Sequence, residues 1–278
     1  MSGLAPRHPL RALLVAAPAL LRPDTLPAQT VSAEPVPVHD SFVLSSRRVA
    51  EARRINVYLP PGYDATHHRY PVLYLPDGGV AEDFPHVVNS LDSLIRMGRV
   101  RPFLVVGIEN TERRRDMTGA TTVGSDSAIA PHVGGSAAFR AFIRDELMPE
   151  IRRRYRTTDE TGIIGESLAG LFIVETLLRE PALFTHYIAL SPSLWWNRDA
   201  LVSAAPALLA GLGRRKHTLF LAAANEPGIA PQADTLARSI RARAPRGLTF
   251  HYVPRPDLEH STIYRALGPA AMEAVLGR

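Results

Sequence analysis

Apolar residues along this chain occur in short runs that alternate with stretches of helical spacing. The runs within 53–63, 69–79 and 103–108 predict strands, because they are short, rich in β-branched and aromatic residues, and two of them end at Pro or Gly. Residues 137–155 repeat apolar positions every three to four residues, which predicts a helix, and a shorter helix is expected around 87–97. The same patterns predict strands at 161–167, 186–192, 217–224 and 248–254, and helices at 168–180 and 234–243.

This alternation of strands and helices predicts an α/β fold. Strands joined by helices run parallel, and a parallel sheet needs helices on both faces. A length of 278 residues suits a single domain of this kind. We therefore expect one mostly parallel central sheet covered by helices on both sides.

The first residues have a different pattern. Arg7, His8 and Arg11 precede the apolar run 13–21, and small residues follow up to Ala28. This order is typical of a secretory signal, and the run is too short to span a bilayer, which takes about 20 residues. We interpret 1–28 as a signal peptide, 29–40 as a linker and 41–278 as the folded domain, and expect a periplasmic or secreted protein without a membrane span. A disordered or wrongly assigned start is the alternative.

Composition and charge narrow the choice of function. The net charge is +5, but Lys216 is the only lysine among the 32 Lys and Arg, which points to coding bias rather than to a binding surface. No interleaving of basic and aromatic residues accompanies the charge, so we do not expect nucleic acid as a partner. The chain has no cysteine, which excludes a thiol nucleophile, disulfides and cysteine-based metal sites.

Candidate chemistry first appears in the segment 165–170, GESLAG, between a predicted strand and a predicted helix. A serine nucleophile in such a place needs small neighbours, because the turn from strand to helix is tight. Ser167 is the candidate, and the backbone N–H of Leu168 is a candidate oxyanion donor. The motif departs from G-x-S-x-G at Ala169, although Gly170 follows directly. A small-residue turn used only for packing is the alternative.

A serine of this kind needs a base, and the base needs an orienting acid, in the chain order Ser, acid, His. Four histidines follow Ser167, and only His260 lies after the last predicted strand, in a loop before a helix. Glu226 follows the strand at 217–224 and is our candidate acid. Asp234, Asp257 and Glu259 remain rivals.

The second oxyanion donor is expected after the strand that ends near Leu75. Gly78 and Gly79 offer approachable backbone N–H groups there, unless they form only a turn.

Several segments together resemble the esterase D-like family of α/β hydrolases, described as putative esterases, and its siderophore-esterase branch in particular. The resemblance runs from about residue 53 to the C-terminus. It is carried by YPVLYLPDGG (70–79), VVGIENTERRRDMT (105–118), FIRDELMPEIRRRYRT (142–157), GESLAGLF (165–172), IALSPSLWWN (188–197) and LEHS (258–261).

The resemblance implies the α/β-hydrolase fold, hydrolysis of carboxylic esters by Ser167 and His260, and neither metal nor organic cofactor. It leaves Glu226 open, because some siderophore-esterase relatives resemble Ser–His dyads. It also implies an arginine near the site, Arg113 or Arg115, while Trp195 and Trp196 are candidates for a substrate wall. Surface charge and ordinary packing are the alternatives for these four.

The expected partner is a small-molecule ester of the siderophore type or another small carboxylic ester. Acyl transfer on the same fold and a non-catalytic binding domain are the other functions considered. The sequence makes no prediction of the oligomeric state.

Overall fold

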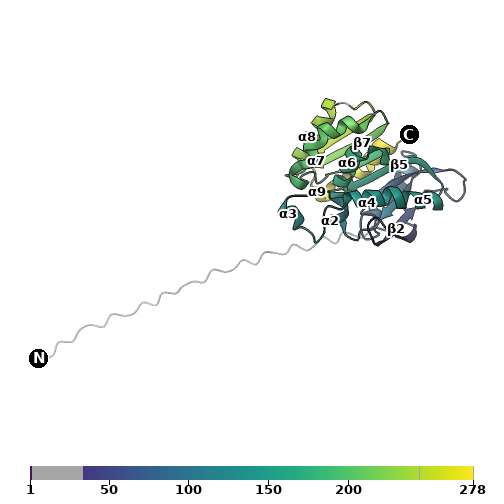
Figure 1. The fold of residues 1–278 in the computed structure, drawn as a ribbon. Coiled ribbons are helices and arrows are strands. Elements are labelled where there is room, and N and C mark those ends of the chain that lie inside the picture. The colour runs from purple at the N-terminus through teal and green to yellow at the C-terminus, as the bar shows by residue number, and fades with distance from the viewer. Residues whose placement is uncertain (2–33, 244, 278) are drawn as a thin grey trace. The chain divides into compact units, whose positions relative to one another are not determined.

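A computed structural model describes Met1, residues 34–243 and residues 245–277 (Figure 1). The chain divides into two units, Met1–Ala33 and Glu34–Arg278, and all the helices and strands given below belong to the second. The predicted signal peptide and the first part of the predicted linker, 29–33, lie outside the described residues, apart from Met1. They therefore stay predictions.

Eight strands form the sheet. They are β1 (Asp40–Ser45), β2 (Ala52–Tyr58), β3 (Tyr70–Pro76), β4 (Leu104–Ile108), β5 (Thr157–Glu166), β6 (His186–Leu190), β7 (His217–Ala224) and β8 (Leu248–Arg255). Their order in the sheet is β1-β2-β4-β3-β5-β6-β7-β8. Only the pairs β1–β2 and β2–β4 are antiparallel, and all other neighbours run parallel. The expected α/β fold with a mostly parallel sheet is confirmed.

Nine α-helices accompany these strands in the described part of the chain. They are α1 (Phe84–Arg96), α2 (Arg113–Met117), α3 (Gly124–Ser127), α4 (Ser136–Phe142), α5 (Met148–Arg154), α6 (Leu168–Arg179), α7 (Trp196–Leu208), α8 (Ala230–Arg243) and α9 (His260–Leu276). A π-helical turn, Ile143–Leu147, joins α4 to α5, so the helix predicted at 137–155 is one helical run with a wider turn inside it. This turn precedes Pro149, whose ring cannot donate the usual backbone hydrogen bond.

Both faces of the sheet are covered because successive side chains of a strand point to opposite sides. In β3, Val72 and Tyr74 join one hydrophobic cluster, and Leu73 and Leu75 join the other. The first cluster includes buried residues of α4, α5, α6, α7 and α8, and the second includes those of α1 and α9. This two-sided burial explains why β3 is an unbroken apolar run in the sequence.

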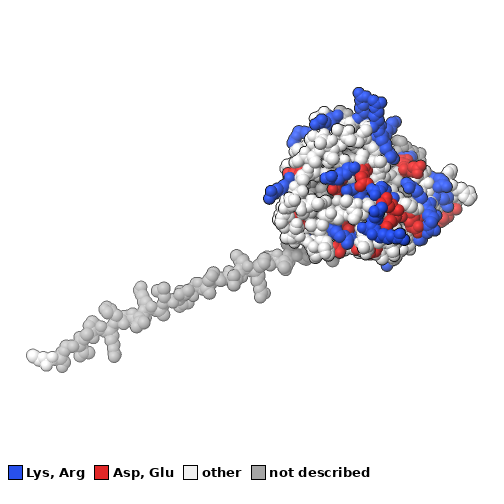
Figure 2. Space-filling model, in the orientation of Figure 1, with Lys and Arg blue, Asp and Glu red and all other residues white. Residues whose placement is uncertain are grey.

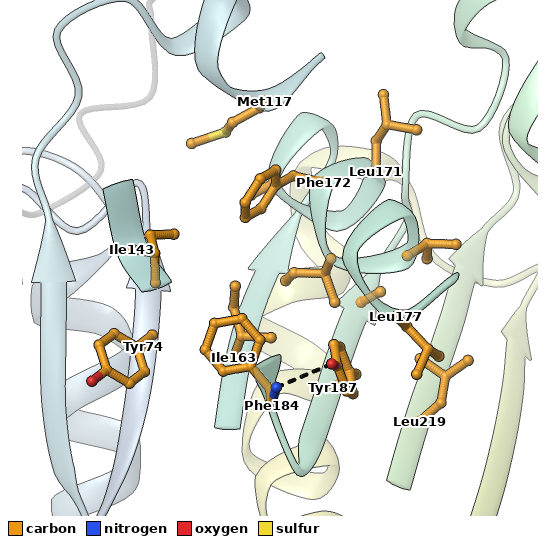
Figure 3. Packing of buried hydrophobic residues seen from close by; sticks show 14 of the residues in the cluster. Tyr74, Met117, Ile143, Ile163, Leu171, Phe172, Leu177, Phe184, Tyr187 and Leu219 are labelled. Carbon is orange, nitrogen blue, oxygen red and sulfur yellow. Dashed lines mark hydrogen bonds between the residues drawn. The ribbon is translucent and has the colours of Figure 1, made fainter. Parts of the chain in front are cut away.

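Figure 3 shows the first cluster around α6. Phe172 on α6 packs between the sheet and the neighbouring helices, and Met117 of α2 reaches the same cluster. The hydroxyl of Tyr187 accepts a hydrogen bond of 3.2 Å from the backbone N–H of Phe184. The buried polar group of this tyrosine is thereby satisfied without leaving the core.

Charged side chains mix at the surface. Positive and negative groups lie next to one another over much of the visible face in Figure 2. Several are ion-paired, among them Arg153 with Glu150 and Arg144 with Glu180. No helix in the described part of the chain has the length and apolar character needed to cross a membrane.

Candidate active site

Ser167 occupies a strained turn between β5 and α6. Its backbone angles, φ 60° and ψ −120°, lie in a region that L-residues rarely adopt. Three hydrogen bonds hold this turn. The N–H of Ser167 donates to the Leu190 carbonyl over 3.0 Å, and the Ser167 carbonyl accepts from the N–H groups of Leu171 (2.9 Å) and Ser193 (3.0 Å). The structure thus places the predicted nucleophile in the elbow geometry that the sequence suggested.

The small residues around Ser167 are required by close contacts. A Cβ on Gly165 would lie 2.6 Å from the Cβ of Ala169, and one on Gly170 would lie 3.0 Å from the Cα of Pro192. Because Gly165 has no side chain, the methyl group of Ala169 fits where the usual motif has glycine. The departure from G-x-S-x-G therefore leaves the turn intact.

His260 and Glu226 meet at the carboxyl end of the sheet. The Nδ1 atom of His260 lies 2.9 Å from Oε2 of Glu226, and the two side chains are 32% and 40% exposed. The contact atoms themselves are shielded from solvent, but the carboxylate oxygen is not aligned with the ring for a hydrogen bond. The sequence had predicted His260 in a loop before a helix. The structure instead has it as the first residue of α9.

The rival carboxylates have other partners. Asp234 accepts a hydrogen bond of 2.6 Å from the hydroxyl of Tyr252, and Asp257 pairs with Arg255. Glu259 is the N-cap residue of α9, where its backbone N–H donates to the hydroxyl of Thr262 over 3.2 Å. Glu226 is therefore the one of these four candidates that contacts the ring of His260.

The candidate nucleophile and the candidate base form no hydrogen bond with each other among the described residues. Among the described residues, the Oγ atom of Ser167 forms a hydrogen-bonding contact only with Oγ of Ser193, at 3.3 Å. Hydrogen bonds between catalytic groups are often long or unformed before substrate binds. Ser167, Glu226 and His260 follow β5, β7 and β8 respectively, so all three lie near the carboxyl ends of parallel strands, where α/β folds bind ligands.

The candidate oxyanion donors differ in their availability. Leu168 is the first residue of α6, where backbone N–H groups have no partner within the helix. By contrast, Gly78 donates to the Ile108 carbonyl over 2.9 Å, and Gly79 donates to the carboxylate of Glu82 over 2.7 Å. The expectation that both loop amides are freely approachable is therefore not met in this conformation, because the loop turns back against β4.

The two candidate arginines are held in ion pairs. Arg113 binds Asp77 through two hydrogen bonds of 2.6 and 2.8 Å, and its side chain is 36% exposed. Arg115 contacts both Glu51 and Asp116. The Arg113 side chain is thus partly exposed, whereas the Arg115 side chain is only 21% exposed and pairs with two carboxylates.

The two candidate tryptophans also differ. Trp196 is buried, and its indole N–H donates to the Gly119 carbonyl over 2.8 Å, so most of the ring belongs to the core. Trp195 is partly exposed and lies close to Gly228, where an added Cβ would come within 3.7 Å of it. Trp195 therefore packs on the loop that carries Glu226.

A group of carboxylates beside the nucleophile had not been predicted. Burial, followed by the nearby charge of Asp77, raises the pKa of Asp83 to about 7. Burial also raises the pKa of Glu166 to about 8, with the charge of Asp83 adding to the effect. The neighbouring Arg113 offsets part of both shifts. Asp77 and Asp83 lie in the loop between β3 and α1, whereas Glu166 ends β5, so the sequence gives no signal that Glu166 meets the other two.

The described residues contain no group of three or more His, Asp or Glu arranged to hold a metal ion.

Comparison with known proteins identifies the family. A family model described as "Putative esterase" matches residues 46–224, well over half of the chain. The chain belongs to this family. The match includes Ser167 but ends before Glu226 and His260.

Individual relatives agree with this assignment. The ferri-bacillibactin esterase BesA of Bacillus subtilis is 33% identical over 194 residues, covering 62% of this chain and 64% of that protein. A siderophore triacetylfusarinine C esterase of Aspergillus fumigatus is 32% identical over 194 residues, covering 63% of this chain and 62% of that protein. The chain thus spans slightly less than two thirds of the length of these two relatives.

A solved structure extends the similarity across the fold. The IroE-like serine hydrolase of Shewanella oneidensis superposes with a TM-score of 0.77 at 30% identity, covering 85% of this chain and 79% of that one. The expected family and the α/β-hydrolase fold are both confirmed.

Proposed function

We propose that this protein is a serine esterase that hydrolyses carboxylic esters through Ser167, His260 and Glu226. The observation that carries the proposal is the strained elbow at Ser167, at the same edge of the sheet as the contact between His260 and Glu226. A strained residue at a strand end, near a histidine with a carboxylate partner, is the arrangement that acyl transfer to serine requires.

In the proposed mechanism, the Oγ atom of Ser167 attacks the ester carbonyl while Nε2 of His260 takes its proton. The N–H of Leu168 stabilises the negative charge that develops on the carbonyl oxygen. Gly79 becomes a second donor once the Glu82 carboxylate turns away from its N–H. His260 then protonates the leaving alcohol. A water molecule gives a proton to His260 as it attacks the acyl carbon, and His260 returns that proton to Oγ of Ser167 when the acid is released.

We infer that the substrates are siderophore-type esters. The relatives named above are esterases of ferri-bacillibactin and of triacetylfusarinine C, which supports this class of substrate. An ester panel that includes iron-free and iron-loaded siderophores tests it. Hydrolysis of simple esters only, with both siderophore forms untouched, would contradict the siderophore assignment but not the esterase.

Labelling with a fluorophosphonate probe tests the esterase itself. We expect the intact protein to be labelled and Ser167→Ala to be unlabelled. A protein that takes no label and cleaves no ester would instead be a binding domain on this fold. Product analysis with added alcohol acceptors distinguishes hydrolysis from acyl transfer.

We further propose that the protein is exported to the periplasm or beyond the cell, with cleavage after Ala28. The support is the order of basic, apolar and small residues in the first 28 positions. Expression in a Gram-negative host should yield periplasmic protein that begins at Gln29. Cytoplasmic protein that retains its N-terminus would count against export.

A further inference from the structure

Ser193 has a buried hydroxyl whose hydrogen-bonding partner is the nucleophile. Its side chain lies in the connection between β6 and α7, and the residue is only 3% exposed. The Oγ atom is 3.3 Å from Oγ of Ser167, and within the described residues no other group bonds to it. Burying a hydroxyl removes its hydrogen bonds to water, and here the contact with Ser167 is the one that replaces them.

Backbone contacts fix the main chain of Ser193 beside the nucleophile. Its N–H donates to the carbonyl of Ser167, so the same residue contacts the nucleophile twice. Ser191, two residues earlier, is anchored to β7, since its N–H donates to Ala222 and its Oγ accepts from the N–H of Ala224. Pro192 packs closely on Gly170, where an added Cβ would lie 3.0 Å from the Cα of Pro192. These contacts hold the backbone that carries the Ser193 hydroxyl next to Ser167.

We propose that Ser193 is a positioning residue for the nucleophile, donating a hydrogen bond to Oγ of Ser167 during attack. The inference rests on the proposed esterase function. In the resting protein either hydroxyl can be the donor. If Ser167 donates to Ser193, its proton points away from His260; if Ser193 donates, the Ser167 proton is free for the base.

The direction of this bond is decided as the reaction proceeds. As the Ser167 proton passes to His260, Oγ of Ser167 carries partial negative charge while its bond to the carbonyl carbon is forming. The π electrons of the carbonyl group move to its oxygen, where the N–H of Leu168 stabilises the charge. Ser193 keeps its own proton and is then the donor. Hydrogen bonds to a charged acceptor are shorter and about twice as strong as those between neutral groups, so the contact tightens from 3.3 Å as charge builds. A contact that strengthens in the transition state raises kcat rather than substrate affinity.

The variant Ser193→Ala tests this. We expect kcat and the rate of fluorophosphonate labelling to fall by about 10- to 100-fold with little change in KM, as is typical for loss of a hydrogen bond to a charged group. Ser193→Thr keeps the hydroxyl and should recover most of the rate per folded molecule. A purely structural role predicts no such recovery and no selective effect on kcat.

Ser191→Ala is the matched control, because it removes another buried hydroxyl from the same connection without touching Ser167. It should lower the melting temperature and leave the labelling rate of the folded protein nearly unchanged. A wild-type rate in Ser193→Ala, or equal losses in both alanine variants, would overturn the inference. Failure of the intact protein to take label would refute the esterase proposal itself, and the role of Ser193 with it.

Discussion

The nucleophile side and the base side of the candidate site are held in place by different means. Ser167 sits in a backbone turn with a φ of 60°, between Gly165 and Gly170, which are both closely packed. His260 and Glu226 are about one third exposed or more, and they approach without hydrogen-bond alignment. The elbow is therefore set by the interior of the fold, whereas the base and the acid are set by side chains at the rim. Backbone hydrogen bonds and close packing keep an atom in place more firmly than an exposed side chain can.

The largest effect should come from the nucleophile itself. Ser167→Ala should lower kcat by about a million-fold, as typically follows loss of a triad serine, because no other group can form the acyl-enzyme. The fold should be retained, since the substitution removes only one oxygen atom from the elbow. Steady-state kinetics on an ester substrate measure kcat, and circular dichroism measures whether the fold is retained. Near-normal turnover in the folded variant would refute the mechanism.

The next prediction tests the exposed pair, Glu226 and His260. If Glu226 orients His260, Glu226→Gln should lower kcat by about 10⁴-fold with little change in KM, as in a full triad. If the loosely aligned contact contributes little, the loss should be about tenfold or less, and the enzyme works as a dyad.

Asp234→Asn and Asp257→Asn are the controls for that experiment. Both remove a carboxylate that the structure pairs elsewhere, with Tyr252 and Arg255. Each should leave kcat within a few-fold of the original. A large loss at either position, with a small loss at Glu226, would show that the wrong carboxylate had been chosen.

A third prediction tests the close packing around the elbow at Ser167. Gly165→Ala should destabilise the protein by about 1–3 kcal/mol, because its Cβ would lie 2.6 Å from that of Ala169. The double variant Gly165→Ala with Ala169→Gly removes this clash and should regain much of the stability. Urea unfolding measures both.

Gly211→Ala serves as a control for that pair, because nothing lies within 4 Å of its would-be Cβ. An equal change in unfolding free energy at Gly211 and Gly165 would mean that close packing does not set the elbow.

The last prediction concerns pH and the carboxylates near the elbow. Folding raises the pKa of Glu166 from its ordinary value of 4.5 to about 8, so the native state binds more protons than the unfolded chain between these values. Stability linked to this group is therefore complete below about pH 4.5 and is lost as the pH rises through 8. Glu166→Gln should flatten the fall in melting temperature over this window. Melting curves that stay parallel to the wild type, as expected for the exposed Asp64→Asn, would contradict the assignment.

Much of the fold could be read from local pattern. The strands β3, β4, β6 and β7 were predicted because two-sided burial makes each an apolar run. β1 was missed, since its side chains are mostly exposed and its sequence carries no such run. α7 was missed as well: three consecutive residues, 197–199, have positive φ near its start, and Pro206 lies inside it. Proline is disfavoured inside helices, and the sequence does not mark the unusual backbone angles at 197–199.

The features of the candidate site also fall into those that the sequence predicts and those that only the structure shows. By itself, the sequence located Ser167 as the candidate nucleophile, because a strand–turn–helix with small residues is a local pattern. It also determined the family through several ordered segments. Only the tertiary structure decided which carboxylate contacts His260, that the amides of Gly78 and Gly79 are already bonded, and that Ser193 contacts Ser167. These facts depend on groups far apart in the chain, brought together by the packing of strands at one edge of the sheet. Local sequence patterns predict strands and turns, because these depend on neighbouring residues. They do not predict contacts between residues that are far apart in the chain.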